Sequence, residues 1–179
     1  MVESRSEQGR SAGSRALCAV LLNPPLRDVE ETVTCKNLRA ALPLFNCDEL
    51  RIVNLVDIAS RDQVALQKIE INMSEILRSR ELISQAIDEA GEVLLAWGSS
   101  RISGESGRLL REQSKWVRAH LTANGTLRVW TIQGKPRHPS RWRQYVGPQK
   151  GRAKGSTFEE RLASLLTSEG AHNSERALR

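Results

Sequence analysis

The stretch ALCAVLLNPP, residues 16–25, decides the fold. Seven apolar residues from Ala16 to Leu22 run without interruption and end in an asparagine and two prolines. A continuous apolar run of this length, bounded by turn residues, predicts a strand that is buried on both faces. Such strands belong to parallel sheets covered by helices, and the two prolines cannot continue the hydrogen-bonded ladder.

Three later segments have the same build, an apolar run that ends in polar or turn-forming residues. They are LRIVNLVD (residues 50–57), EVLLAWGSS (92–100) and LRVWTIQGKPRHPS (127–140). The segments between them have apolar residues at helical spacing, so strand and helix alternate along the chain. We therefore predict a three-layer α/β/α fold with a central, mostly parallel sheet of four strands.

The predicted helices have recognisable start and stop signals. Ser74 is the expected N-cap of the clearest helix, and Gly91 follows its end. The predicted helical segments are residues 32–45, 62–69, 74–90, 105–121 and a short amphipathic helix carrying Phe158, Leu162, Leu165 and Leu166.

The predicted organisation is one folded domain between two polar ends. Residues 1–15 have almost nothing to bury and are expected to be disordered. The domain spans residues 16–147, and residues 148–179 form a basic, glycine-rich linker followed by the short helix. No apolar run approaches the roughly 20 residues of a membrane span, and there is no signal-peptide pattern. We therefore expect a cytoplasmic protein that does not engage a membrane.

Composition indicates the class of partner. Lysine and arginine outnumber the acids 27 to 21, which gives a net charge of +6 and suggests a polyanion, most often nucleic acid. The three cysteines form no CxxC pair, so neither a disulfide framework nor a four-cysteine metal site is expected. We expect no metal, no organic cofactor and no obligate protein partner.

The ends of the four predicted strands suggest one site, because ligands of parallel sheets bind outside the carboxyl ends of the strands. Asn23, Asn54, residues 97–99 and His138 all lie at such ends. Each also has a purely structural interpretation. The asparagines can be turn or loop residues, Trp97 can belong to the core, and His138 can be an ordinary loop histidine.

Four motifs, in their order along the chain, resemble those of the uracil-DNA glycosylase superfamily. They are LLNPP (residues 21–25), RIVN (51–54), LLAWGSS (94–100) and HPSRW (138–142). The chain also resembles an uncharacterised bacterial and phage family with LNPS, VNL, WG and PRHP signatures. Together the resemblances cover about residues 17–147.

The resemblance implies a monofunctional DNA glycosylase that hydrolyses the bond between a flipped base and its sugar. His138 would donate a hydrogen bond to the departing base, and Asn23 would position the attacking water. Asn54 would read the Watson–Crick edge of the base. No lysine lies in a motif position that a lyase mechanism would need. The phosphate contacts would come from Ser99, Ser140, Arg137, Arg141 and Arg143.

Departures from the motifs suggest a different substrate from uracil. Pro25 stands where uracil-specific members have a bulky tyrosine, which leaves room for a large C5 substituent. Hydroxymethylated or glucosylated cytosine of phage DNA would fit, in a role in anti-phage defence. Arg141 and Trp142 stand where the family has an apolar wedge, and either could fill the gap left by the flipped nucleotide. Phe45 is the nearest candidate to stack on the base.

Two other functions are consistent with the same sequence. An N-glycosidase of free modified nucleotides would need the same pocket without the DNA contacts. A non-catalytic nucleic-acid-binding module would keep the pocket without the chemistry, since the amide of Asn23 cannot take up a proton as a carboxylate can. The sequence leaves open whether the DNA is single- or double-stranded.

Overall fold

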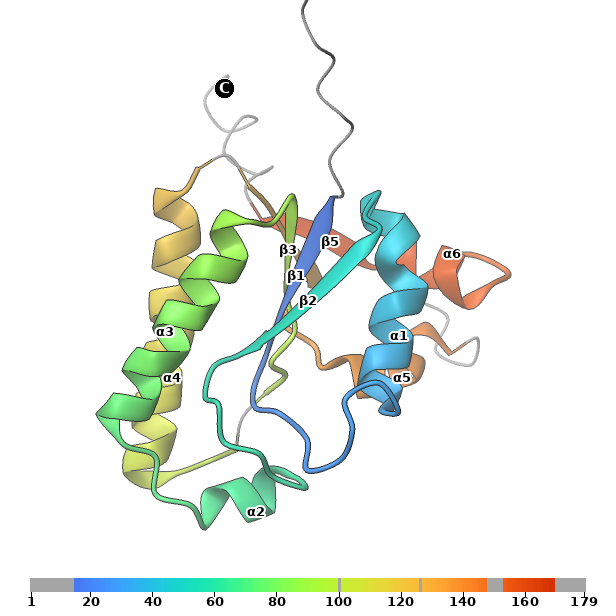
Figure 1. Ribbon diagram of the computed structural model, residues 1–179. Helices are drawn as coiled ribbons and strands as arrows, with labels where there is room; N and C mark the ends of the chain where they lie inside the picture. The colour runs from blue at the N-terminus through green and yellow to red at the C-terminus, as the bar shows by residue number, and fades with distance from the viewer. Residues whose placement is uncertain (1–14, 100, 126, 148–152, 170–179) are drawn as a thin grey trace, which may run out of the picture.

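A central sheet separates two layers of helices in the computed structural model (Figure 1), which describes residues 15–99, 101–125, 127–147 and 153–169. Helices α3 and α4 cover one face, and α1, α5 and α6 cover the other. The strands are β1 (Ala16–Leu21), β2 (Glu49–Asn54), β3 (Glu92–Leu95), β4 (Arg128–Ile132) and β5 (Leu166–Glu169). The helices are α1 (Val33–Ala41), α2 (Gln63–Gln67), α3 (Met73–Asp88), α4 (Gly104–Ala123), α5 (Trp142–Val146) and α6 (Phe158–Ala163), with 3-10 turns η1 (Leu42–Phe45) and η2 (Pro139–Arg141).

The sheet of the described residues has the strand order β2-β1-β3-β4-β5. The four predicted strands are all present and run parallel to one another. All six residues of β1 are buried, as its continuous apolar run predicts. The α/β class and the mostly parallel sheet are therefore confirmed.

The sheet has a fifth strand that we did not expect, so the predicted count of four is wrong. β5 pairs with β4 in the antiparallel direction, and α6 ends at Ala163. Leu165 and Leu166 therefore lie outside the helix that was expected to include them. All four residues of β5 are half-buried, and its sequence LTSE shows no alternation of apolar and polar residues. Leu162 and Leu165 are buried, so α6 and β5 pack on the same core as the rest of the sheet.

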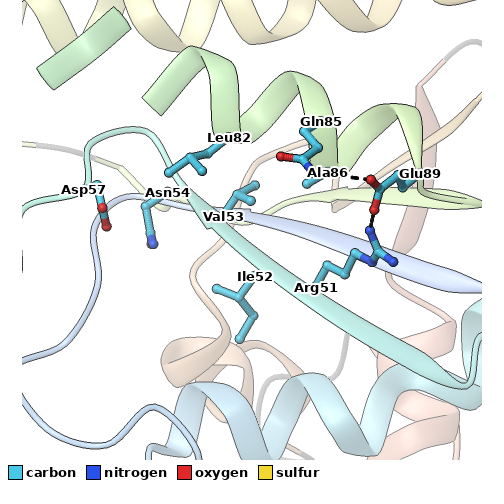
Figure 2. Close-up of a pocket in the computed structure, with 9 residues that line it drawn as sticks. All are labelled: Arg51, Ile52, Val53, Asn54, Asp57, Leu82, Gln85, Ala86 and Glu89. Atoms are coloured by element: carbon cyan, nitrogen blue, oxygen red, sulfur yellow. Dashed lines mark hydrogen bonds and ion pairs between the residues drawn. The ribbon is translucent and has the colours of Figure 1, made fainter. Parts of the chain in front are cut away.

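β2 is an edge strand, and its residues are half-buried although its apolar run predicts full burial. Only one of its two edges pairs with another strand, β1. Successive side chains still alternate between the faces of the sheet. Figure 2 shows Ile52 and Asn54 on the side of α1, and Val53 on the side of α3.

The helix starts are set by side-chain caps. Thr32 and Asp62 cap α1 and α2 through their side chains. The predicted N-cap of α3, Ser74, is wrong. The N-cap is Asn72, and the helix begins at Met73. Asn72 forms a reciprocal capping box with Glu75.

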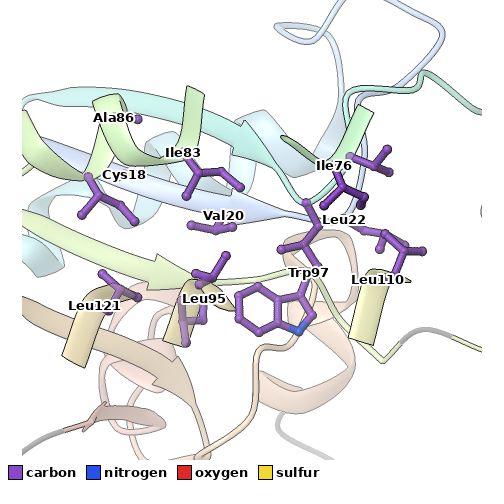
Figure 3. Packing of buried hydrophobic residues seen from close by; sticks show 14 of the residues in the cluster. Cys18, Val20, Leu22, Ile76, Ile83, Ala86, Leu95, Trp97, Leu110 and Leu121 are labelled. Carbon is purple, nitrogen blue, oxygen red and sulfur yellow. The ribbon is translucent and has the colours of Figure 1, made fainter. Parts of the chain in front are cut away.

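Two hydrophobic clusters fill the layers on either side of the sheet. Figure 3 shows Cys18 and Val20 of β1, and Leu22 directly after the strand, packed between residues of α3 and α4, such as Ile83 and Leu110. The alternate residues of β1 point into the second cluster, beneath α1 and α5. Burial raises the pKa of the Cys18 thiol to about 12, so this cysteine is an inert part of the core. Among the described helices, none is both long and apolar enough to cross a membrane.

The structure gives no description of residues 1–14, 148–152 and 170–179. The predicted disordered tail, apart from Arg15, and half of the predicted basic linker therefore lie outside the described residues.

Candidate active site

Four loops lie at one edge of the sheet, because they follow the carboxyl ends of the four parallel strands (Figure 1). We name them loop 1 (residues 22–32), loop 2 (55–62), loop 3 (96–99 and 101–103) and loop 4 (133–138). Neighbouring strands are about 4.8 Å apart. The strand order therefore places loop 1 between loops 2 and 3, and loop 4 beyond loop 3.

The side chain of Asn23 fixes loop 1 to loop 2. Its Nδ2 donates to the carbonyl oxygens of Pro24 (2.9 Å) and Ile58 (3.2 Å) and to Ser60 Oγ (2.9 Å). The Ser60 N–H donates in turn to the Pro24 carbonyl at 3.1 Å. A carboxylate here would face two carbonyl oxygens, so this loop requires an amide. No group of the described residues donates to Asn23 Oδ1, which leaves that oxygen as a hydrogen-bond acceptor.

Loop 4 leaves β4 through a tight turn at Gln133 and Gly134, where both residues have positive φ. The turn is closed by a bridge between Ile132 and Lys135, and the Gln133 N–H donates to the Leu165 carbonyl at 2.8 Å. The C-terminal segment that carries β5 therefore supports the base of loop 4. This contact joins parts of the chain that are about thirty residues apart, and no local sequence signal predicts it.

His138 caps η2 with its imidazole ring. The Ser140 N–H donates to His138 Nδ1 at 3.4 Å, and Ser140 Oγ lies 2.9 Å from the same atom. A backbone N–H can only donate, so Nδ1 is an acceptor and the proton of the neutral ring is on Nε2. The geometry therefore assigns His138 as an N–H donor through Nε2.

The neutral form of His138 is favoured by its surroundings. Burial, together with the smaller effect of the positive charge of Arg141, lowers its pKa to about 4. Both causes disfavour the protonated ring. At neutral pH the ring is therefore an uncharged donor and does not act as a protonated acid.

Gly98 holds loop 3 against His138. Its φ is +75°, and a Cβ at this position would lie 3.2 Å from the Cβ of His138. The Gly98 N–H also donates to the Pro136 carbonyl at 2.5 Å. Loop 4 therefore folds back over the end of β3, which brings His138 one strand closer to Asn23. The sequence showed Gly98 at a strand end but did not show its contact with His138.

Asn37 is a second support of the His138 segment that the sequence did not indicate. It lies on α1, is 7% exposed, and donates through Nδ2 to the Pro139 carbonyl at 2.8 Å. Residues 37 and 139 are 102 positions apart, and neither motif contains the asparagine. This hydrogen bond therefore fixes η2 against α1.

Two glutamines of α2 join loop 2 to loop 3. Gln63 donates to the Ser99 carbonyl (3.1 Å) and accepts from the Arg101 N–H (3.1 Å). Gln67 makes the same pair of bonds to the backbone of Ser103, at 3.4 and 2.7 Å. The Ser99 side chain remains exposed at this edge. Loops 1, 2, 3 and 4 are thus linked in sequence by side-chain and backbone hydrogen bonds.

Asn54 ends the edge strand β2 and lies at the outer side of the site. Its Oδ1 is buried and has no hydrogen-bond partner in the described chain. The residue also lines a groove of about 220 Å³ between the free edge of β2 and α3 (Figure 2). Buried acceptors without a partner are rare, and no group of the described chain holds this oxygen in its present position.

Two predicted DNA or base contacts are wrong, because both side chains are in the core. Trp142 is fully buried and donates through Nε1 to the Arg137 carbonyl at 3.0 Å, so it cannot insert into a base stack. Phe45 is 2% exposed and packs edge-on against Trp130, with ring centroids 5.8 Å apart. Trp97 is 7% exposed and belongs to the core, which was the structural alternative to a role in the site.

The other predicted contact residues lie on loops 1, 3 and 4 or just after them. Arg141, Arg143 and Ser140 are exposed, and Pro25 is half-buried in loop 1. Arg137 is half-buried, and its guanidinium lies 3.9 Å from the centroid of the Tyr145 ring, which fixes it on α5. The described residues contain no cluster of three or more metal-binding side chains.

The basic character of the chain is concentrated in the stretch of sequence that contains His138. Residues 128–158 contain eight lysines and arginines and no acid. The whole chain has 27 basic and 21 acidic residues, so the remainder has 19 and 21, a net charge of −2. The entire positive net charge of the protein therefore comes from the segment that includes loop 4, η2 and α5.

Comparison with known proteins gives one assignment. No curated protein and no solved structure matches the chain significantly. A family model matches residues 6–140, which is more than half of the chain and ends directly after His138 and Pro139. The chain therefore belongs to the family described as "Protein of unknown function (DUF1643)".

Proposed function

We propose that this protein is a DNA glycosylase that hydrolyses the bond between a flipped pyrimidine and its deoxyribose. The observation that carries the proposal is the pair formed by His138 and Asn23. One presents a neutral, fixed N–H donor and the other an oxygen acceptor, on loops at the same edge of the sheet. The fold also brings loop 4 back toward loop 1 through the contact of Gly98 with His138.

The two groups suit the two charges that develop in this reaction. When the bond breaks, the base departs with negative charge and the sugar becomes positive. A hydrogen bond from His138 Nε2 to the base carbonyl would stabilise the anion, and one such preorganised donor contributes about 3 kcal/mol. Asn23 Oδ1 would accept a hydrogen bond from the attacking water and orient it toward the sugar.

The surrounding charge supports a polyanionic substrate. The acid-free segment 128–158 would attract the phosphate backbone, with Arg141 and Arg143 exposed next to the site. Ser99 and Ser140 are exposed at the same edge and would donate to phosphate oxygens. A free nucleotide would not need eight basic residues in one segment, which favours DNA over the N-glycosidase alternative.

Leu26 is the best candidate to fill the gap left by a flipped nucleotide, since Trp142 is buried. Leu26 is 71% exposed, lies on loop 1 directly after Pro25, and is followed by the exposed Arg27. Apolar side chains of this kind can enter a base stack and stabilise a kinked duplex. We further propose that the substrate base carries a bulky C5 group, which Pro25 leaves room for, and that the protein acts against phage DNA.

The test is base release from defined DNA. Oligonucleotides carrying one uracil, 5-hydroxymethylcytosine or glucosylated 5-hydroxymethylcytosine are incubated with the protein, treated with alkali and examined for strand breaks. His138→Asn should abolish the breaks while keeping the cap on the Ser140 N–H, because asparagine is a good N-cap. Gln144→Asn, on the exposed side of α5, is the matched control and should keep full activity.

Four outcomes would decide the proposal. No breaks with any base would refute it. Full activity of His138→Asn would refute the role of the imidazole. Base release from free nucleotides that duplex DNA does not inhibit would favour the N-glycosidase instead, and DNA binding without base release would favour a binding module.

A further inference from the structure

The groove beside Asn54 starts at the candidate site and extends away from it. It runs along the free edge of β2 and is bounded on the other side by α3 (Figure 2). Its volume is about 220 Å³, below the roughly 300–1,000 Å³ typical of pockets for drug-sized ligands. A groove of this size fits one small group, such as a single monosaccharide, and is short for a peptide.

The lining of the groove combines polar groups with an apolar wall. Asp57 lies at the end nearest to loop 2, and Gln85 donates to Glu89 at 3.4 Å at the other end. Glu89 also pairs with Arg51 of β2, so these side chains are held in place. Between the two polar ends, α3 presents Leu82, which is 46% exposed.

This combination matches the chemistry of a sugar. Each hydroxyl of a sugar both donates and accepts, so it can bind the carboxylate of Asp57 as a donor and the amide of Gln85 in either direction. The C–H face of the ring is apolar and would lie against Leu82. A phosphate has no apolar face to lie against Leu82, and Asp57 would repel it.

Asn54 connects the groove with the site. Its Oδ1 is buried without a partner, so its amide can turn about the terminal torsion without losing a hydrogen bond. Turning exposes an acceptor at the point where the groove meets loops 1 and 2. A base bound at Asn54 would then direct a substituent on its ring toward Asp57.

We propose that the groove between β2 and α3 is a carbohydrate subsite, which holds a hexose attached to the C5 substituent of the substrate base. This inference rests on the proposed function for its link to DNA, but the binding of a sugar in the groove can be measured alone. It assigns Asp57, Leu82 and Gln85 as determinants of specificity that do not touch the bond that breaks.

The first experiment measures base release with two substrates and a blocked groove. Gln85→Trp places a large side chain over the groove from an exposed position of α3, and Ala119→Trp, exposed on α4, is the matched control. Gln85→Trp should lower release of glucosylated 5-hydroxymethylcytosine about tenfold or more, the scale of lost pocket contacts. Release of 5-hydroxymethylcytosine should change little, and Ala119→Trp should affect neither. Equal effects of Gln85→Trp on both bases, or on neither, would overturn the subsite.

The second experiment is independent of catalysis. Methyl glucoside is titrated into the wild-type protein, and backbone amide shifts are recorded by NMR. Shifts at Asp57, Leu82 and Gln85 that disappear in Gln85→Trp would support the subsite even if no base is released, in which case the proposed function alone would fall. No shifts at these residues, together with base release that does not depend on the sugar, would overturn the subsite and leave the glycosylase proposal standing.

Discussion

Replacing Gly98 with alanine tests whether loop 3 positions His138. The substitution has two costs. Alanine at φ +75° is in the left-handed region, which costs about 1–2 kcal/mol. The new Cβ would also lie 3.2 Å from the Cβ of His138, so loop 4 must move by a few tenths of an ångström. The hydrogen bond from Gly98 to Pro136 resists that movement, and overpacking of this kind adds about 1 kcal/mol.

Gly104 provides the matched control. Its φ is +64°, but a Cβ there would meet nothing within 4 Å, so Gly104→Ala carries only the conformational cost. We expect a loss of about 2–3 kcal/mol for Gly98→Ala and of about 1–2 kcal/mol for Gly104→Ala. With an unfolding slope of about 2 kcal/mol/M, the urea midpoint falls by about 1–1.5 M in the first variant and by about 0.5–1 M in the control.

The position of His138 is followed by NMR of the imidazole ring in the same samples. Gly98→Ala should shift its ring signals and raise its pKa, because displacement of loop 4 exposes the ring to solvent. Gly104→Ala should leave both unchanged. Equal losses of stability in the two variants, with unchanged ring signals in both, would refute the close approach of Gly98 to His138.

Four further predictions concern single side chains. The pKa of His138 is about 4 in the folded protein and about 6.5 when unfolded. The free energy of unfolding should therefore fall as the pH drops from about 6.5 toward 4, and it should fall less in His138→Asn. Equal acid sensitivity of the two proteins would contradict the buried neutral ring. Asn23→Asp should lose about 1–3 kcal/mol in urea unfolding because a carboxylate faces two carbonyl oxygens, and an unchanged midpoint would rule out the donor role. Trp142→Ala should lose about 3–5 kcal/mol as a core residue, whereas a loss below about 0.5 kcal/mol would indicate an exposed ring. Leu26→Ala should leave the midpoint unchanged and weaken binding to duplex DNA with one unpaired base by about 1 kcal/mol, about fivefold in Kd; unchanged binding would remove Leu26 from the interface.

Much of the fold could be predicted from the sequence because its signals are local. The apolar run of Ala16–Leu21 defines a buried strand by itself, and Thr32 and Asp62 cap the helices that follow them. β5 could not be predicted in this way, since its four half-buried residues have no periodicity and it forms only because β4 offers a free edge. The half-burial of β2 likewise follows from its place in the strand order, which no single strand encodes.

The candidate site divides in the same way. The sequence placed Asn23, Asn54 and His138 at strand ends, because Asn23 and Asn54 directly follow apolar residues and His138 lies in the polar segment after the apolar run that ends at Ile132. It also assigned Trp142 to the site because it lies in a motif, and Phe45 as the nearest aromatic candidate to stack on the base, but the structure buries both. An aromatic residue in a motif has the same sequence signal whether it faces the core or the solvent.

The sequence by itself determined the alternation of strands and helices, the edge where the strand ends gather and the segment that carries the positive charge. These features depend on residues that are close together along the chain. Only the tertiary structure decided that Gly98 and Asn37 hold the His138 segment, that the amide of Asn23 fixes two loops, and that a groove continues from Asn54. Those features depend on contacts between residues up to about a hundred positions apart, which form only when the strands are ordered and the loops fold back over their ends.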